Sequence, residues 1–161
     1  LILVEPVGGL PVLDANKKPI KEFYVGQGEW YLTADLDSEF GAYNVDFAKA
    51  ALEHPDYFTF NGHVNALTDR GLFGPTPPAG SLVPSGKGLL TKQDDTVRLL
   101  FVNGGPNVGS NFHIIGQIFE RVYTGLIKNV NADRSEETIY IAPGSAAIVE
   151  LVTMVPGTYL L

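Results

Sequence analysis

Short runs of β-branched, aromatic and aliphatic residues recur along the chain with turn residues between them, and this spacing constrains the fold most strongly. Gly and Pro contribute 18 and 11 of the 161 residues, so turns are frequent. Strands at such regular spacing predict an all-β sandwich with Greek-key connections. The runs are KEFYVGQGEWYL (21–32), YFTFNG (57–62), TVRLLFVN (96–103), FHIIGQIFERVY (112–123), EETIYIAPG (136–144) and AAIVELVTMVPGTYLL (146–161).

Two parts of this pattern carry more specific expectations. The run 112–123 predicts either one long strand or two strands broken at Gly116. The runs from 136 to 161 together predict three strands with Pro-Gly turns between them. The stretch GLFGPTPPAGSLVPSGKG (71–88) has Gly, Pro or Ser at most positions and predicts an exposed loop insertion.

One segment, NVDFAKAALEHPDY (44–57), favours a helix. Asp46 is the expected N-cap, alanine and leucine fill the interior, and Pro55 ends the helix. At about two turns, such a helix would lie on the surface and not in the core.

Both ends of the chain read as strand-like: it opens with LILVEP and closes with PGTYLL. We therefore expect a fragment that is truncated at both ends. Residues from about 22 to 161 should form the sandwich without its final strands, and Leu1 to Val4 should be detached or loosely packed.

Charge and composition exclude several classes of function. The net charge of −7 leaves no basic stripe for nucleic acid. The absence of cysteine excludes disulfides, cysteine nucleophiles and a blue-copper centre built from these residues, since that centre needs a thiolate. No apolar run approaches 18 residues, so we expect no transmembrane segment.

The three histidines are the candidates for chemistry. His54 stands at the expected helix end, where a cation is favourable, and His63 stands in the turn-like FNGHVNALT. No two of them have metal-ligand spacing. His113 follows a loop rich in Gly and Asn, and strand alternation puts it on one face with Ile115 while Ile114 points the other way. From the residues alone, His113 is either a buried structural histidine or a functional group delivered by the loop.

Several longer motifs point to a family. The segments LILVEP, KEFYVGQGEWY, FNGHVNALT, GGPNVGSNFHIIGQIFERVY, SAAIVEL and VPGTYLL resemble those of copper-containing, NO-forming nitrite reductases. The resemblance covers nearly the whole chain, and the loop 71–88 is the main departure. It implies a cupredoxin-like fold, with residues 1–21 as the end of a first cupredoxin domain and a connector, and residues 22–161 as an incomplete second domain.

The resemblance also implies an activity. In that family three subunits form a ring, and a type 1 copper in the first domain receives an electron from a donor, a cupredoxin or a cytochrome c. A type 2 copper lies between the first domain of one subunit and the second domain of its neighbour. Nitrite bound there is reduced with one electron and two protons to nitric oxide and water. This is a periplasmic reaction of denitrification.

Residue by residue, the resemblance makes His113 the catalytic histidine beside the type 2 copper, which it does not ligate. Ile115 resembles the isoleucine that packs over the copper and restricts how nitrite sits. Glu137 and Thr138 resemble a pair that forms hydrogen bonds around this histidine. The copper ligands and the catalytic aspartate lie outside this segment in the family, so the resemblance implies no metal ligand here and no activity for the segment alone.

Two other readings remain open at this stage. A laccase-like multicopper oxidase would share the sandwich, but it needs His-x-His pairs that this chain lacks. A metal-free cupredoxin-like module would serve only in assembly or binding.

Overall fold

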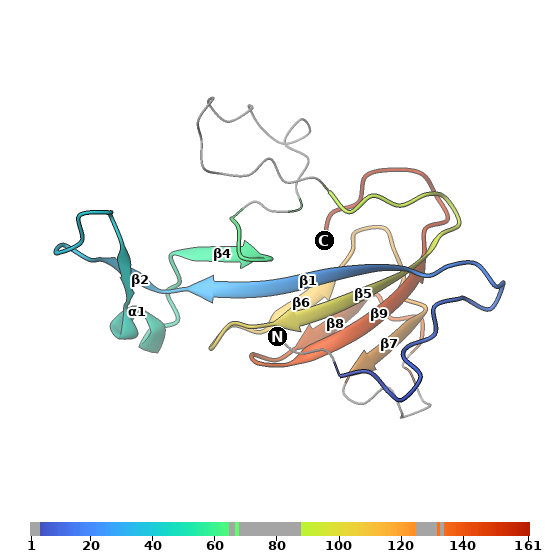
Figure 1. Cartoon of the computed structure of the whole chain (residues 1–161), viewed down its shortest axis with the longest axis horizontal. Helices are drawn as coiled ribbons and strands as arrows, with labels where there is room; N and C mark the ends of the chain where they lie inside the picture. The colour runs from blue at the N-terminus through green and yellow to red at the C-terminus, as the bar shows by residue number, and fades with distance from the viewer. Residues whose placement is uncertain (1–3, 65–66, 68–87, 125–131, 133) are drawn as a thin grey trace.

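The computed structural model describes residues 4–64, 67, 88–124, 132 and 134–161. Within these residues the chain forms short β-strands and a single short helix (Figure 1). In chain order they are β1 (Lys21–Trp30), β2 (Leu32–Ala34), β3 (Tyr43–Val45), α1 (Phe47–Ala51), β4 (Tyr57–Phe60), β5 (Thr96–Asn103), β6 (Ser110–His113), β7 (Arg121–Thr124), β8 (Thr138–Ile141) and β9 (Ala146–Val152).

The larger layer is a five-stranded sheet in the order β4-β1-β5-β9-β7. β1 pairs in parallel with β5, and every other pair in the sheet is antiparallel. The register sets Val25 opposite Phe101 and Leu99 opposite Val149. These residues are buried, so one face of the sheet belongs to the core.

β6 and β8 form the second layer, an antiparallel pair. Their inward residues join those of the larger sheet in one apolar cluster. The ring of Phe112 lies 4.5 Å from that of Phe101 and 5.7 Å from that of Phe119, measured between centroids. From β5 to β9 the chain changes layer at every step. The all-β sandwich expected from the sequence is therefore confirmed.

Local sequence explains most of these elements. β1, β5, β8 and β9 follow the apolar runs, and the run 112–123 gives two strands with a turn between them, where Gly116 has a φ of +82°. The side chain of Asp46 accepts a hydrogen bond from the Lys49 N–H at 3.0 Å, which is the predicted N-cap of α1. α1 buries none of its residues, as expected for a surface helix.

Some expectations were wrong, and others concern residues outside the described part of the chain. The predicted strand at the C-terminal TYLL is absent: residues 153–161 form no strand, and the Tyr159 hydroxyl donates to the Val155 carbonyl at 2.7 Å, closing a loop around Pro156. The β2–β3 hairpin was not anticipated. Val4 is 84% exposed, while residues 1–3 and nearly all of the loop 71–88 lie outside the described residues.

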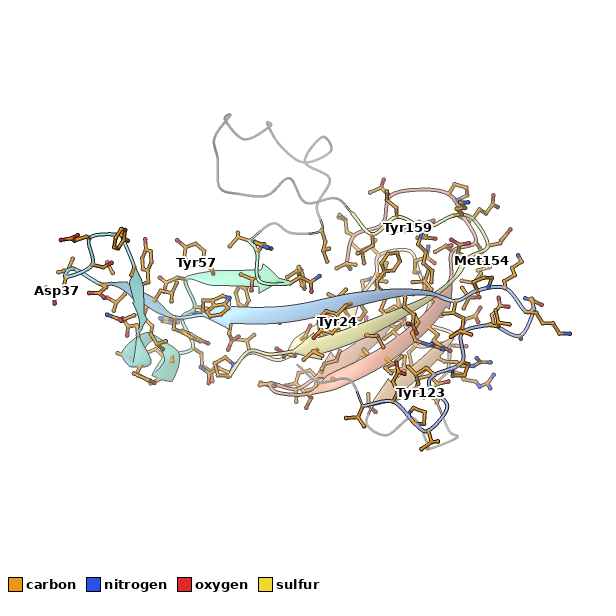
Figure 2. The ribbon with its side chains drawn as sticks, in the orientation of Figure 1. Tyr24, Asp37, Tyr57, Tyr123, Met154 and Tyr159 are labelled. Carbon is orange, nitrogen blue, oxygen red and sulfur yellow. The ribbon has the colours of Figure 1, made fainter. Side chains whose placement is uncertain are left out.

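Residues 32–52, which include β2, β3 and α1, project together from one end of the larger sheet (Figure 1), and we call them the arm. Figure 2 places Asp37, between β2 and β3, at the opposite end of the molecule from Met154. Asp56 holds the base of the arm, because it accepts from the Leu32 N–H at 2.7 Å and pairs with Lys49 at 2.7 Å. Most large side chains of the arm are exposed, including Leu36, Phe40 and Phe47.

Candidate functional site

His113 is the last residue of β6, and its register partner is Thr138, the first residue of β8. Phe112 and Ile114 are buried in the core, whereas His113 is half-buried and Ile115 is 57% exposed. The alternation of burial thus continues past the end of the strand. The structure places His113 and Ile115 away from the core and Ile114 within it.

The imidazole is oriented from β8. Its Nδ1 lies 2.8 Å from the main-chain carbonyl oxygen of Glu137 and 3.2 Å from the hydroxyl oxygen of Thr138. A carbonyl oxygen can only accept, so Nδ1 must carry a hydrogen and donate it. In the neutral ring this leaves the lone pair on Nε2. Nε2 forms no hydrogen bond to any described residue, which leaves it as the atom that can exchange a proton.

The structure therefore brings three of the sequence-predicted residues together: His113, Glu137 and Thr138. Glu137 takes part through its backbone carbonyl and not through its carboxylate. Sequence patterns do not distinguish these two modes, because every residue offers a carbonyl oxygen.

The loop that leads into β6, residues 104–109, is held by two buried side chains that the sequence analysis did not single out. Glu29 of β1 accepts from the N–H groups of Asn107 and Val108. Asn103, at the end of β5, donates to the Val108 carbonyl at 2.8 Å. Burial raises the pKa of Tyr31 beside this loop, and the hydrogen bond of its hydroxyl to Glu29 raises that pKa further. The only sequence signal was a charged residue in an apolar strand.

The other two histidines lie elsewhere. His54 is exposed beyond α1, and its N–H donates to the Lys49 carbonyl at 3.0 Å. His63 is exposed in the turn after β4, where its N–H donates to the Phe60 carbonyl at 3.0 Å. Among the described residues, no group of three His, Asp or Glu could hold a metal ion.

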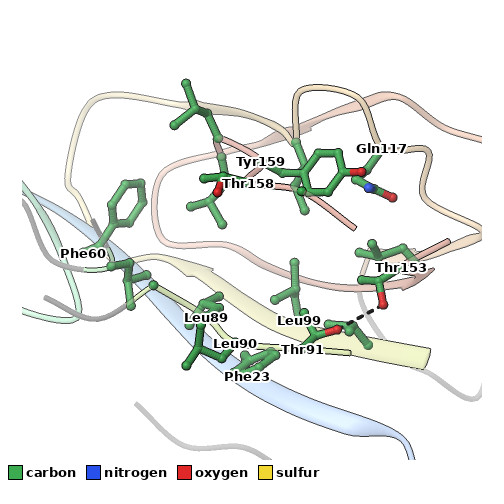
Figure 3. Close-up of a pocket in the computed structure, with 18 of the residues that line it drawn as sticks. Phe23, Phe60, Leu89, Leu90, Thr91, Leu99, Gln117, Thr153, Thr158 and Tyr159 are labelled. Carbon is green, nitrogen blue, oxygen red and sulfur yellow. Dashed lines mark hydrogen bonds between the residues drawn. The ribbon is translucent and has the colours of Figure 1, made fainter. Parts of the chain in front are cut away.

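A cavity of about 830 Å³ lies on the core side of the larger sheet (Figure 3). Phe23 and Leu99 line it from the sheet, and Tyr159 lines it from the C-terminal segment. A hydrogen bond of 3.0 Å joins the hydroxyls of Thr91 and Thr153 at its edge (Figure 3). Ile114 lines the cavity but His113 does not, so this cavity is separate from the candidate site.

Comparison with known proteins bears on what such a site does. No family model matches the chain. The copper-containing nitrite reductase of Neisseria meningitidis serogroup B is 41% identical over 161 residues, covering 100% of this chain and 35% of the relative. That of Neisseria gonorrhoeae is 40% identical with the same coverage.

The chain is similar to copper-containing nitrite reductases along its whole length. It spans about a third of the length of these curated relatives. The copper-containing nitrite reductase of Cereibacter sphaeroides is more distant, at 30% identity over 98% of this chain and 40% of the relative.

Solved structures agree on the fold. A copper nitrite reductase from Nitrosomonas europaea superimposes with a TM-score of 0.60 at 26% identity, covering 86% of this chain and 41% of that one. A multicopper oxidase reaches a TM-score of 0.59 at 19% identity over 98% of this chain and 41% of that one. Identity that low shows a common fold alone. The cupredoxin-like fold expected from the sequence is thereby confirmed.

A bilayer-spanning helix needs about 20 apolar residues, and the part of the chain that the structure describes holds no such helix.

Proposed function

We propose that this chain is part of a copper-dependent nitrite reductase that forms nitric oxide, and that His113 handles protons in that reaction. The observation that carries the proposal is the orientation of the ring. Nδ1 is committed to the Glu137 carbonyl at 2.8 Å, and Nε2 is left for exchange on the outward side of the sandwich. Nitrite as the substrate and copper as the metal are proposed from the similarity to copper-containing nitrite reductases.

The chemistry suits an imidazole. Nitrite, one electron and two protons give nitric oxide and water: one N–O bond breaks, the nitrogen takes the electron, and the leaving oxygen takes both protons. An imidazole has an ordinary pKa of about 6.5, so it can donate a proton and recover it near neutral pH. A positioned general acid typically contributes about 10²- to 10⁴-fold to such a step.

The described residues alone contain no group of three His, Asp or Glu side chains that could ligate a copper ion. His54, His63 and His113 lie on separate segments, and the sequence has no cysteine. We therefore propose that the copper ligands come from outside these 161 residues. This chain would contribute the proton-handling Nε2 of His113 and, in Ile115, an apolar side chain that limits how a small anion can approach.

The proposal extends to the assembly. If His113 acts beside a copper ion whose ligands are not in this chain, that ion must lie next to the outward side of the imidazole. A homotrimer with the copper site between two subunits would place it there. The exposed apolar side chains of the arm offer further surface for such contacts. We propose a periplasmic enzyme of denitrification whose electron donor is a cupredoxin or a cytochrome c.

The test is His113→Ala in the complete, copper-loaded enzyme, with the exposed His54→Ala and His63→Ala as matched controls. Turnover of nitrite should fall at least about tenfold more than in either control. The visible spectrum of the type 1 copper should stay unchanged, and the pH profile should lose or shift its limb in the imidazole range. Wild-type turnover and pH dependence at full copper loading would refute the proposal, as would joint loss of stability and both coppers.

A further inference from the structure

Glu29 is a buried carboxylate, and the described residues that donate hydrogen bonds to it are neutral. It is 6% exposed. One of its oxygens accepts from the Tyr31 hydroxyl at 3.0 Å and from the N–H groups of Asn107 and Val108 at 2.6 and 3.0 Å. Among the described residues no cation pairs with it, and burying an unpaired carboxylate is unfavourable unless hydrogen bonds compensate. The loop amides provide that compensation.

The loop is built around this carboxylate. A Cβ atom added at Gly105 would lie 2.9 Å from the Glu29 carboxyl carbon, so only glycine lets the backbone approach so closely. Asn107 extends the contact, because its side-chain amide donates to the Ala50 carbonyl at 2.8 Å and to the Tyr31 hydroxyl at 3.1 Å. The loop 104–109 is thereby tied to β1 and to the helix of the arm.

The same loop is tied to the strands that bear the candidate site. Asn103, fully buried, donates to the carbonyls of Val108 and Ile141 at 2.8 and 3.2 Å. Ile141 is the residue of β8 that pairs with Ser110, at the other end of β6 from His113. The polar contacts of Glu29 and Asn103 therefore connect the larger sheet to the start of the β6–β8 pair.

We propose that Glu29 is a positioning residue for His113, a role that rests on the proposed function. Val108 precedes His113 by only five residues, and four of these form β6. If the loop moves, β6 moves with it relative to the larger sheet, and the outward placement of the imidazole changes. Misplacement of a reacting group by about 1 Å can cost about 10²-fold in rate.

The test compares Glu29→Ala with Glu29→Gln and with Glu150→Ala in the complete copper-loaded enzyme. Glu150 is the matched control because it is also a buried carboxylate, but it pairs with Arg98 at the other end of β5. Glu29→Ala should lower kcat about tenfold or more with little change in KM. Glu29→Gln keeps one acceptor oxygen for the amides and should recover most of that loss. Glu150→Ala should lower the melting temperature while keeping kcat within about twofold of wild type.

Two further measurements separate this role from general stability. Hydrogen exchange of peptides covering residues 104–113 should be faster in Glu29→Ala than in Glu150→Ala. In the His113→Ala background, Glu29→Ala should cost no further activity, because it acts through the missing ring. A further loss in that background, or unchanged exchange, would overturn the inference and leave the proposed function standing. If Glu29→Ala does not fold, Glu29→Asp, which withdraws the carboxylate from the amides, takes its place under the same criteria.

Discussion

At the scale of single residues, the ring of His113 is oriented by a backbone atom of Glu137, the residue that directly precedes β8. The Glu137 carbonyl is the nearer partner of Nδ1, and the Thr138 hydroxyl is the farther one. A carbonyl holds the ring in one tautomer at every pH at which the ring is neutral, whereas a hydroxyl can donate or accept. The orientation should therefore survive most side-chain changes on β8.

Thr138→Val tests this ranking of partners. The substitution keeps the shape of the side chain and removes only the hydroxyl, while the 2.8 Å contact to Glu137 remains. A neutral hydrogen bond contributes about 0.5–1.5 kcal/mol, so nitrite turnover of the complete enzyme should fall about two- to twelvefold. Steady-state kinetics beside His113→Ala provide the measurement. A loss as large as that of His113→Ala would show that the hydroxyl is the partner that matters.

At the scale of elements, the carboxylate of Asp56 forms two of the polar contacts at the base of the arm. Asp56 holds both the Leu32 N–H and the Lys49 ammonium group, and Lys49 also donates to the Leu32 carbonyl at 2.7 Å. The hydrogen bond from Lys49 lowers the pKa of Asp56, and the bond from the Leu32 N–H lowers it further. Most large side chains of the arm are exposed, so polar contacts such as these contribute to keeping it in place.

This pKa shift predicts that acid loosens the arm. A carboxylate with a lower pKa in the folded state contributes stability above its unfolded pKa, about 3.9, and loses that contribution as pH falls through the folded value. The protection of the amides of residues 32–52, measured as the exchange rate relative to the intrinsic rate at the same pH, should therefore fall below about pH 4. Asp56→Asn should show fast exchange already at neutral pH. Asp37→Asn, at the exposed hairpin tip, should behave like wild type; equal effects of both substitutions would contradict the assignment.

At the scale of the whole molecule, the described part of the sandwich presents one half-buried histidine on β6 and no group of three His, Asp or Glu that could hold a metal ion. The core joins both layers through residues such as Phe101 and Phe112, whose rings pack against each other. His113 ends β6, whereas His54 lies beyond α1 and His63 lies in the turn after β4. This arrangement agrees with the proposal that the chain supplies one group to a centre whose other members lie elsewhere.

The 161-residue chain alone should therefore bind copper weakly and show no blue colour. A blue centre needs a thiolate, and the separated histidines cannot chelate one ion together. Elemental analysis of the dialysed chain and its visible spectrum provide the measurement. Tight, stoichiometric copper after dialysis would contradict the prediction.

Sequence patterns predicted the structure correctly where the interactions that determine an element lie close together along the chain. β5 follows the run 96–103 residue for residue, and Asp46 caps α1 as its position before an alanine-rich stretch indicates. Strand alternation also predicted that Ile114 faces away from His113. In each case the side chains that decide the structure lie within a few positions of one another, so propensity and periodicity can detect them.

Only the tertiary structure decided the features that depend on distant partners. Glu29 meets the amide of Asn107 across 78 positions, and β1 pairs in parallel with β5, more than 70 positions away. The partner of His113 is a backbone carbonyl, which every residue possesses. The strand-like TYLL closes a loop in which the Leu160 carbonyl accepts from Ile115. Such contacts follow from how the layers pack, because chain distance and residue type do not specify which groups meet once the core has formed.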